Sequence, residues 1–157
     1  SNTISLVAMP HLVILYTGNL DLPAAQGGSD MKALCRKLAD TMLAARDEQG
    51  KQVFPTGGTR VLAFPAAHYA VADDGSAGRS AGGDGNYAFV YLNLRMAKGR
   101  SAAVHEAVGK AVEATTKAHF AEHLATRHIG ITLQIDEGHE VFDAKNSSLH
   151  PLFQPKA

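Results

Sequence analysis

The sequence is poor in cysteine, lacks tryptophan, carries no net charge and has no long apolar run. Its single cysteine, Cys35, excludes an intramolecular disulfide and is typical of a reducing compartment. Lysine and arginine together number 15, as do aspartate and glutamate, so no overall field attracts nucleic acid or an anionic membrane. Because no segment approaches the roughly 20 apolar residues that span a bilayer, we expect a cytoplasmic protein without nucleic-acid or membrane partners.

The length and composition are those of one globular domain. Hydrophobic residues make up 45% of the 157 residues and charged residues 19%, which is ordinary for such a domain. A chain of this size buries roughly two-thirds of its unfolded surface, so it needs neither disulfides nor metal ions to fold. Residues 1–8 lack the basic flank of a signal peptide, and we expect them to be an extension ahead of a single domain.

The first half of the chain predicts a strand, a helix and a second strand. Residues 11–16 are short, apolar and rich in β-branched side chains, which favours a buried strand. Ser29 can cap a helix that runs to about Arg46, because apolar side chains recur there at helical spacing. Residues 59–72 predict the second strand. These elements form a first β-α-β unit within residues 10–72.

The second half repeats this pattern after a glycine-rich segment. Residues 73–86 contain almost no large apolar group and lack the glycine spacing of a phosphate-binding loop, so we expect a flexible loop. Residues 87–94 alternate as a strand does, Ser101 can cap a helix to about Arg127, and residues 129–135 alternate again. The second unit therefore occupies residues 87–139, and residues 140–157 form an irregular tail.

Two β-α-β units define the expected fold class, which is α/β in the broad sense and α+β in arrangement. Each unit is a right-handed crossover between parallel strands. Two units share one four-stranded sheet with both helices on one face. The strand at 87–94 is apolar on both faces, because Phe89 and Tyr91 alternate with Val90 and Leu92. The simplest cover for the second face is another subunit.

Among eight histidines, His119 and His123 have the spacing of metal ligands. With Glu122 they spell H-x-x-E-H, which is found in one class of zinc proteases. The alternative is a helix on which an imidazole faces solvent or a neighbouring residue. Because so short a motif often matches by chance, we expect no metal.

A basic cluster follows the third predicted strand and consists of Arg95, Lys98 and Arg100. Such a cluster is either a solvated loop or a clamp for carboxylates, which guanidinium groups bind through two parallel hydrogen bonds. The residues alone leave both interpretations open.

The pair Met9-Pro10 suggests more specific chemistry. In a chain cut to begin at Pro10, this residue has a free secondary amine at the start of a buried strand. An α-amino group titrates near pH ~8, and burial beside a cation lowers that pKa, so the amine becomes a general base near neutral pH. Inside a longer chain the same nitrogen belongs to a peptide bond and has no basicity, and Pro10 then merely begins a strand.

Several short motifs occur in an order and spacing that resemble one family. They are Met9-Pro10-His11, the segment 54–60 that ends at Arg60, the strand start at 87–90, the turn 99–101 that contains Arg100, His119-Phe120 and the tail segment 149–153. Together they resemble the 5-carboxymethyl-2-hydroxymuconate isomerase family of the tautomerase superfamily. The resemblance runs from Met9 to Phe153.

The resemblance implies a homotrimer with active sites at subunit boundaries and no cofactor. It also implies isomerisation of an unsaturated, multiply carboxylated 2-hydroxy acid in the breakdown of aromatic compounds. Pro10 would move a proton from the dienol to a different carbon, while Arg60 and Arg100 would bind the small-molecule carboxylate and stabilise developing negative charge. We also expect His11, adjacent to Pro10, to contact the substrate.

The nine residues before Pro10 leave two functions open. In the first case these residues are an extension that the active protein lacks, and we favour this case because Met9 stands where an initiator methionine would. In the second case the residues are part of the active protein, and the catalytic base is lost. In the second case the chain is a non-catalytic trimer on the same scaffold, which binds a small carboxylate through Arg60 and Arg100.

Overall fold

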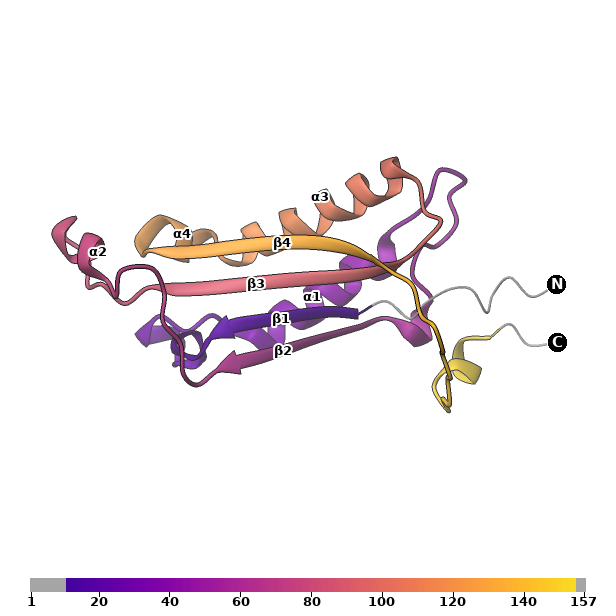
Figure 1. Cartoon of the computed structure of the whole chain (residues 1–157), viewed down its shortest axis with the longest axis horizontal. Helices are drawn as coiled ribbons and strands as arrows, with labels where there is room; N and C mark the ends of the chain where they lie inside the picture. Colours follow the sequence, from indigo (N-terminus) through magenta and orange to yellow (C-terminus); the bar gives the residue numbers. More distant parts are fainter. Residues whose placement is uncertain (1–10, 155–157) are drawn as a thin grey trace.

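The computed structural model describes residues 11–154. Four strands form one mixed sheet in the order β2-β1-β3-β4, in which β1 is parallel to β2 and antiparallel to β3, and β3 is parallel to β4. The strands are β1 (His11–Thr17), β2 (Arg60–Ala66), β3 (Ala88–Ala97) and β4 (Ile129–Gly138). The helices are α1 (Met31–Ala44), α2 (Ser76–Ser80), α3 (Ala102–His119) and α4 (Ala121–Thr126). This arrangement confirms the predicted pair of β-α-β units (Figure 1).

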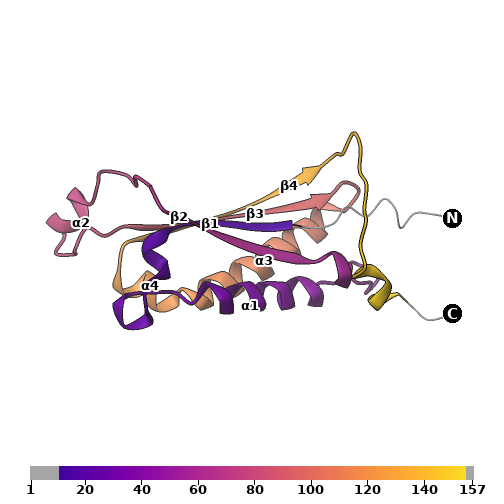
Figure 2. The same cartoon turned by 90° about the horizontal axis from the view of Figure 1, so that it is seen from below.

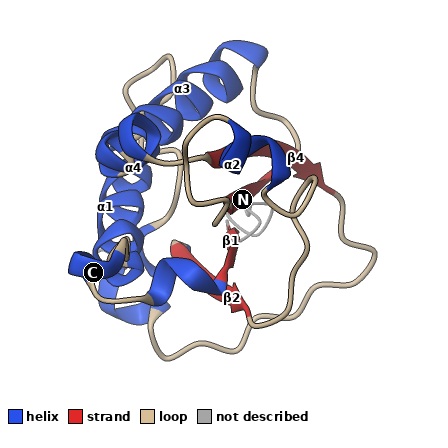
Figure 3. Ribbon diagram, turned by 90° about the vertical axis from the view of Figure 1, so that its left-hand side faces the viewer, coloured by secondary structure: helices blue, strands red, loops and turns tan. Residues whose placement is uncertain are grey.

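Helices α1, α3 and α4 lie on one face of the sheet, as predicted (Figures 2 and 3). Apolar side chains at helical spacing on α1 and α3 face the strands, and alternate strand residues meet them. The fully buried side chains of this core with the largest volumes are Phe120, Leu12, Ile14, Leu20, Leu34, Leu38, Met42, Leu92, Leu94, Met96, Val90 and Val112.

No helix of residues 11–154 covers the opposite face of the sheet (Figure 2). On that face the side chains of Leu15, Leu62 and Phe64 are 48%, 44% and 50% exposed. The strand register pairs Val13 with Leu62 and Leu15 with Phe64, so these side chains form one contiguous patch on β1 and β2. This patch, defined by Val13, Leu15, Leu62 and Phe64, is a candidate for contact with another subunit.

The helix caps agree with prediction at α3 and differ at α1. The Ser101 side chain accepts a hydrogen bond from the Val104 N–H at 3.2 Å, as an N-cap does. The predicted cap Ser29 is wrong: Asp30 caps α1 instead, and its carboxylate accepts from the Ala33 N–H at 3.1 Å. Ser29 is buried in the preceding loop, where its hydroxyl donates to a backbone carbonyl oxygen.

Two predicted elements differ in length. β2 ends at Ala66 rather than near residue 72. The helix predicted over residues 101–127 is interrupted at Phe120, whose side chain is fully buried between the end of α3 and the start of α4. No helix within residues 11–154 is both long and apolar enough to cross a membrane.

The glycine-rich segment 73–86 is more regular than the flexible loop predicted, because it contains α2. The Asp73 carboxylate accepts hydrogen bonds from two backbone N–H groups near the start of this helix, at 3.2 and 2.9 Å. The Tyr87 hydroxyl accepts from the Gly78 N–H at 2.8 Å. Hydrogen bonds to polar side chains order this segment. The spacing of apolar residues in the sequence does not reveal such hydrogen bonds.

Candidate active site

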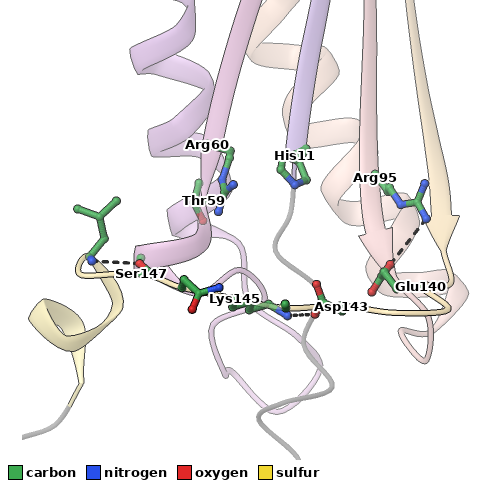
Figure 4. Close-up of a pocket in the computed structure, with 12 residues that line it drawn as sticks. His11, Thr59, Arg60, Arg95, Glu140, Asp143, Lys145 and Ser147 are labelled. Carbon is green, nitrogen blue, oxygen red and sulfur yellow. Dashed lines mark hydrogen bonds and ion pairs between the residues drawn. The ribbon is translucent and has the colours of Figure 1, made fainter.

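Three nitrogen-bearing side chains lie on one row across the sheet. The register pairs His11 of β1 with Arg60 of β2 and with Arg95 of β3. Paired residues in a sheet point to the same face, and the neighbours Leu12 and Leu94 are buried beneath the helices. His11, Arg60 and Arg95 therefore share the uncovered face, with His11 between the two arginines (Figure 4).

A cavity of about 760 Å³ opens around this row. Small-molecule sites typically occupy about 300–1,000 Å³, so the cavity has the size of a metabolite site. Its outer wall is the tail segment 140–149, which runs past the ends of the strands (Figure 4). The lining residues are His11, Gly57, Thr59, Arg60, Arg95, Glu140, Asp143, Ala144, Lys145, Asn146, Ser147 and Leu149.

The tail is positioned where the 3-10 turn η5 (His150–Phe153) packs against the 3-10 turn η4 (Thr56–Gly58). A Cβ atom on Gly57 would lie 3.1 Å from the Phe153 ring and 3.2 Å from the His150 Cα. Glycine at this position therefore permits the close approach that places the tail over the cavity.

The cavity presents positive charge from the sheet and both signs from the tail. Arg95 Nη2 lies 3.7 Å from Glu140 Oε2, and Asp143 and Lys145 form an ion pair within the tail. The arginine of β2, Arg60, is partly buried at the other end of the row. Guanidinium groups bind carboxylates through directed hydrogen bonds, so the sheet side of the cavity suits an organic anion.

The pKa of His11 is lowered from its usual value of 6.5. Burial is the largest cause, and the positive charges of Arg60 and Arg95 add to it. The imidazole is therefore neutral at pH 7, where it can donate a hydrogen bond to a ligand without adding charge.

We expect the imidazole of His11 to titrate below pH 6.5 in an NMR experiment, with the resonance assigned through a His11→Gln variant. Arg95→Gln should move the midpoint part of the way back toward 6.5, because one repelling charge is gone while burial remains. The unfolded chain binds this proton at a higher pH than the folded chain. The free energy of unfolding should therefore rise with pH between the two pKa values. Above pH 6.5 the contribution of His11 to this free energy should be complete. A midpoint at or above 6.5 in the unaltered chain would contradict this prediction.

Of the four predicted site residues, the structure brings His11 and Arg60 together in the cavity. Arg100 does not line it within one chain. Its guanidinium donates to the Val53 carbonyl oxygen at 2.9 Å and so joins the turn before α3 to the segment that precedes β2. The fourth residue, Pro10, lies outside the described residues.

Arg95 lies in the cavity, although the sequence suggested it only as part of a basic cluster with Lys98 and Arg100. Arg95 directly follows the buried Leu94 in the same strand, and successive strand residues point to opposite faces, so its side chain faces away from the core. Its place beside His11 depends on the antiparallel register of β1 and β3. Spacing along a single strand does not reveal that register, which is why the sequence indicated Arg95 only as one member of a basic cluster and not as a neighbour of His11.

The two histidines of the H-x-x-E-H motif contact the loop before α1. His119 Nε2 lies 2.5 Å from the carbonyl oxygen of Ser29, and His123 Nε2 lies 3.2 Å from that of Gly28. Within the described part of the chain, no three histidine, cysteine, aspartate or glutamate side chains are grouped as a metal site requires. The contacts give both imidazoles a structural role, which agrees with the alternative to zinc binding.

The fold and the cavity together define an α+β protein whose cavity has two arginines and a histidine on its sheet side. Residues 10–153 match the 5-carboxymethyl-2-hydroxymuconate isomerase family. The chain is 25% identical over 146 residues to 5-carboxymethyl-2-hydroxymuconate Delta-isomerase of Escherichia coli, an alignment that covers 93% of this chain and 100% of that protein.

Two solved structures extend this similarity. A 5-carboxymethyl-2-hydroxymuconate delta-isomerase matches with 55% sequence identity and a TM-score of 0.90, over 98% of this chain and 99% of that chain. A 5-carboxymethyl-2-hydroxymuconate isomerase from Deinococcus radiodurans R1 matches with 31% identity and a TM-score of 0.75, over 94% and 96% of the two chains. The chain therefore belongs to the 5-carboxymethyl-2-hydroxymuconate isomerase family, which confirms the resemblance and places it among isomerases.

Proposed function

We propose that the protein isomerises 5-carboxymethyl-2-hydroxymuconate, or a closely similar unsaturated 2-hydroxy acid with several carboxylates, in the breakdown of aromatic compounds. The observation that carries this proposal is the row of Arg60, His11 and Arg95 in a cavity of a chain from this isomerase family. Such a row offers two guanidinium groups to carboxylates. It also offers a neutral imidazole to the oxygen that reacts.

The proposed reaction moves one proton and involves no net oxidation. A base takes the proton from the dienol oxygen, the oxygen becomes a ketone while the double bonds shift, and the base returns the proton to a carbon. Negative charge resides on the oxygen between the two transfers, and a fixed cation beside it lowers the barrier. Arg60 supplies that cation and neutral His11 a hydrogen bond. The substrate's own hydroxyl group supplies the proton, so the reaction needs no cofactor.

We assign the base to the nitrogen of Pro10 in a chain that begins at this residue. Pro10 precedes His11 in the sequence, and His11 lines the cavity. A free amine at this position would have a lowered pKa where burial or a neighbouring cation disfavours its charged form. General bases work best when their pKa lies near the working pH, and such an amine meets that condition.

The proposal includes a homotrimer in which Arg100 serves the cavity of a neighbouring subunit. Within one chain Arg100 does not line the cavity, and its side chain is 26% exposed. The patch of Val13, Leu15, Leu62 and Phe64 gives the chain an uncovered apolar face on which another copy can pack. Sites at subunit boundaries would then combine residues from two chains.

We expect Phe64→Asp to turn the oligomer into monomers, because a carboxylate in this patch loses its water when subunits pack together. The core should be unaffected, since the Phe64 side chain faces away from the helices. Light scattering during size-exclusion chromatography measures the mass. Leu22→Asp, at an apolar side chain that is 42% exposed in a loop, is the matched control and should stay trimeric. An unaltered chain that is already monomeric would contradict the proposed trimer.

The function itself is tested with a chain that begins at Pro10 and with 5-carboxymethyl-2-hydroxymuconate as substrate. Ultraviolet absorbance follows the reaction, because the dienol and the ketone have different conjugated systems. Turnover above the rate without protein supports the enzyme. Binding in calorimetry without any turnover would favour the alternative, a non-catalytic trimer that binds small carboxylates. Membership of an isomerase family favours the enzyme.

A further inference from the structure

Arg95 and Arg60 flank His11 at a separation that suits two different groups of one ligand. Neighbouring strands lie about 4.8 Å apart, so two strand spacings put the Cα atoms of these arginines about 10 Å apart. Both side chains lie on the same face and line the same cavity. A ligand that spans the row meets one guanidinium at each end and the neutral imidazole between them (Figure 4).

The guanidinium of Arg95 occupies space that exists only because residue 138 is glycine. A Cβ atom on Gly138 would lie 2.1 Å from Arg95 Nε, 2.5 Å from Nη2 and 2.6 Å from Cζ. Gly138 is not among the residues with a positive φ, so its backbone conformation does not itself require glycine. Because residue 138 at the end of β4 has no side chain, the guanidinium of Arg95 can lie directly over the sheet at this position.

The present partner of Arg95 is weakly held. Glu140 Oε2 lies 3.7 Å away, and the side chains of Arg95 and Glu140 are 50% and 35% exposed. Exposed ion pairs at such distances contribute little stability. Asp136, the strand neighbour of Arg95, already accepts a hydrogen bond from Asn93 at 2.8 Å. A ligand carboxylate can thus replace Glu140 at the guanidinium without leaving a buried charge unpaired.

We propose that Arg95, seated over Gly138, binds a second carboxylate of the substrate while Arg60 binds the first, so that the site selects dicarboxylates over monocarboxylates. This inference rests on the proposed function and names a specificity residue for it. Arg95 acts on binding and selectivity. The proton transfer remains with the other residues of the site.

The test measures binding of two inert probes to the full chain by calorimetry. Muconate and sorbate are conjugated six-carbon acids that differ by one terminal carboxylate, and neither has the hydroxyl group that isomerisation requires. The unaltered chain should prefer muconate. Arg95→Gln should weaken muconate binding at least about tenfold, the size of one charged hydrogen bond, and should change sorbate binding less than about twofold. Arg60→Gln should weaken both probes.

Gly138→Ala is the second variant, because it displaces the guanidinium without removing its charge. It should reduce the preference for muconate in the same direction as Arg95→Gln. Lys110→Gln is the control for loss of one positive charge, since Lys110 is 73% exposed on α3, on the other side of the sheet. Thermal melting confirms that each variant is folded.

Equal losses for muconate and sorbate in Arg95→Gln, no loss for either, or no preference in the unaltered chain would each overturn the inference. So would a failure of the unaltered chain to bind either probe. These outcomes are independent of catalysis, because neither probe can react. A chain that selects muconate through Arg95 but does not isomerise any dienol would refute the proposed function and leave the dicarboxylate site in place.

Discussion

Replacing Arg60 with alanine is expected to lower kcat/KM by about a hundred- to a thousandfold, the usual cost of removing one donor to a developing oxyanion. Arg60 is partly buried and shares its row with His11. In the proposed mechanism, the negative charge that Arg60 would stabilise exists between the two proton transfers. The loss should therefore appear in kcat as well as in KM, and absorbance kinetics with the chain that begins at Pro10 measure both.

Two further variants locate the cause of that loss. Arg60→Lys keeps the charge and removes the planar fork, so it should retain an intermediate rate. Lys110→Gln, which removes an exposed charge from α3, should leave the rate unchanged. An Arg60→Ala variant with normal kcat would show that another group stabilises the oxyanion.

Arg100 can be tested together with Arg60 through mixed oligomers. If the two arginines in one site come from different subunits, a mixture of Arg60→Ala and Arg100→Ala chains contains some complete sites. Random assembly of equal amounts would restore about a quarter of the sites. Two inactive variants that stay inactive after mixing would place both arginines in the same chain or leave Arg100 outside the site. Its role would then be structural, through its bond to the Val53 carbonyl oxygen and its ion pair with Asp47.

The strands and helices were largely predictable because apolar residues repeat with the periods of two and 3.6 that these elements require. Residues 129–135 alternate strictly, and the structure has β4 there. The order of the strands was not predictable from these patterns, because the antiparallel pairing of β1 with β3 brings together segments far apart in the chain. The interruption at Phe120 was also hidden, since a buried aromatic side chain fits the helical pattern on both sides of it.

Only the site residues that belong to motifs along the chain could be predicted from the sequence. Arg60 follows a loop whose residues resemble those of the family, and His11 begins β1. The place of Arg95 depends on the register with His11 and on the space above Gly138. Both are properties of the assembled sheet. The fold of a chain with 15 basic and 15 acidic residues thus brings basic side chains together at one site, although the composition has no excess of basic residues.

The second large effect that we predict is on the rate of isomerisation, and it depends on whether the chain begins at Pro10. A chain that begins at Pro10 should isomerise the substrate about a hundred- to ten-thousandfold faster than the chain with residues 1–9 attached, the range that a positioned acid or base contributes. The reason is covalent: the nitrogen of Pro10 is a secondary amine in the first chain and a peptide nitrogen in the second. Absorbance kinetics on both chains, with mass spectrometry of their first residues, measure the difference.

The pH profile distinguishes loss of the base from distortion of the cavity. In the chain that begins at Pro10, kcat/KM should rise with pH as the amine loses its proton. The proposed mechanism requires this amine to lie beside Arg60, whose positive charge would disfavour the charged form of the amine; the midpoint should then lie below the usual value of about 8 for an α-amino group. Arg60→Gln should shift that midpoint upward. A chain that begins at Met9 and keeps this residue has its amine one position away and should be slow. Equal rates for all three chains would show that the proton is moved by another group, and His11 would be the next residue to replace.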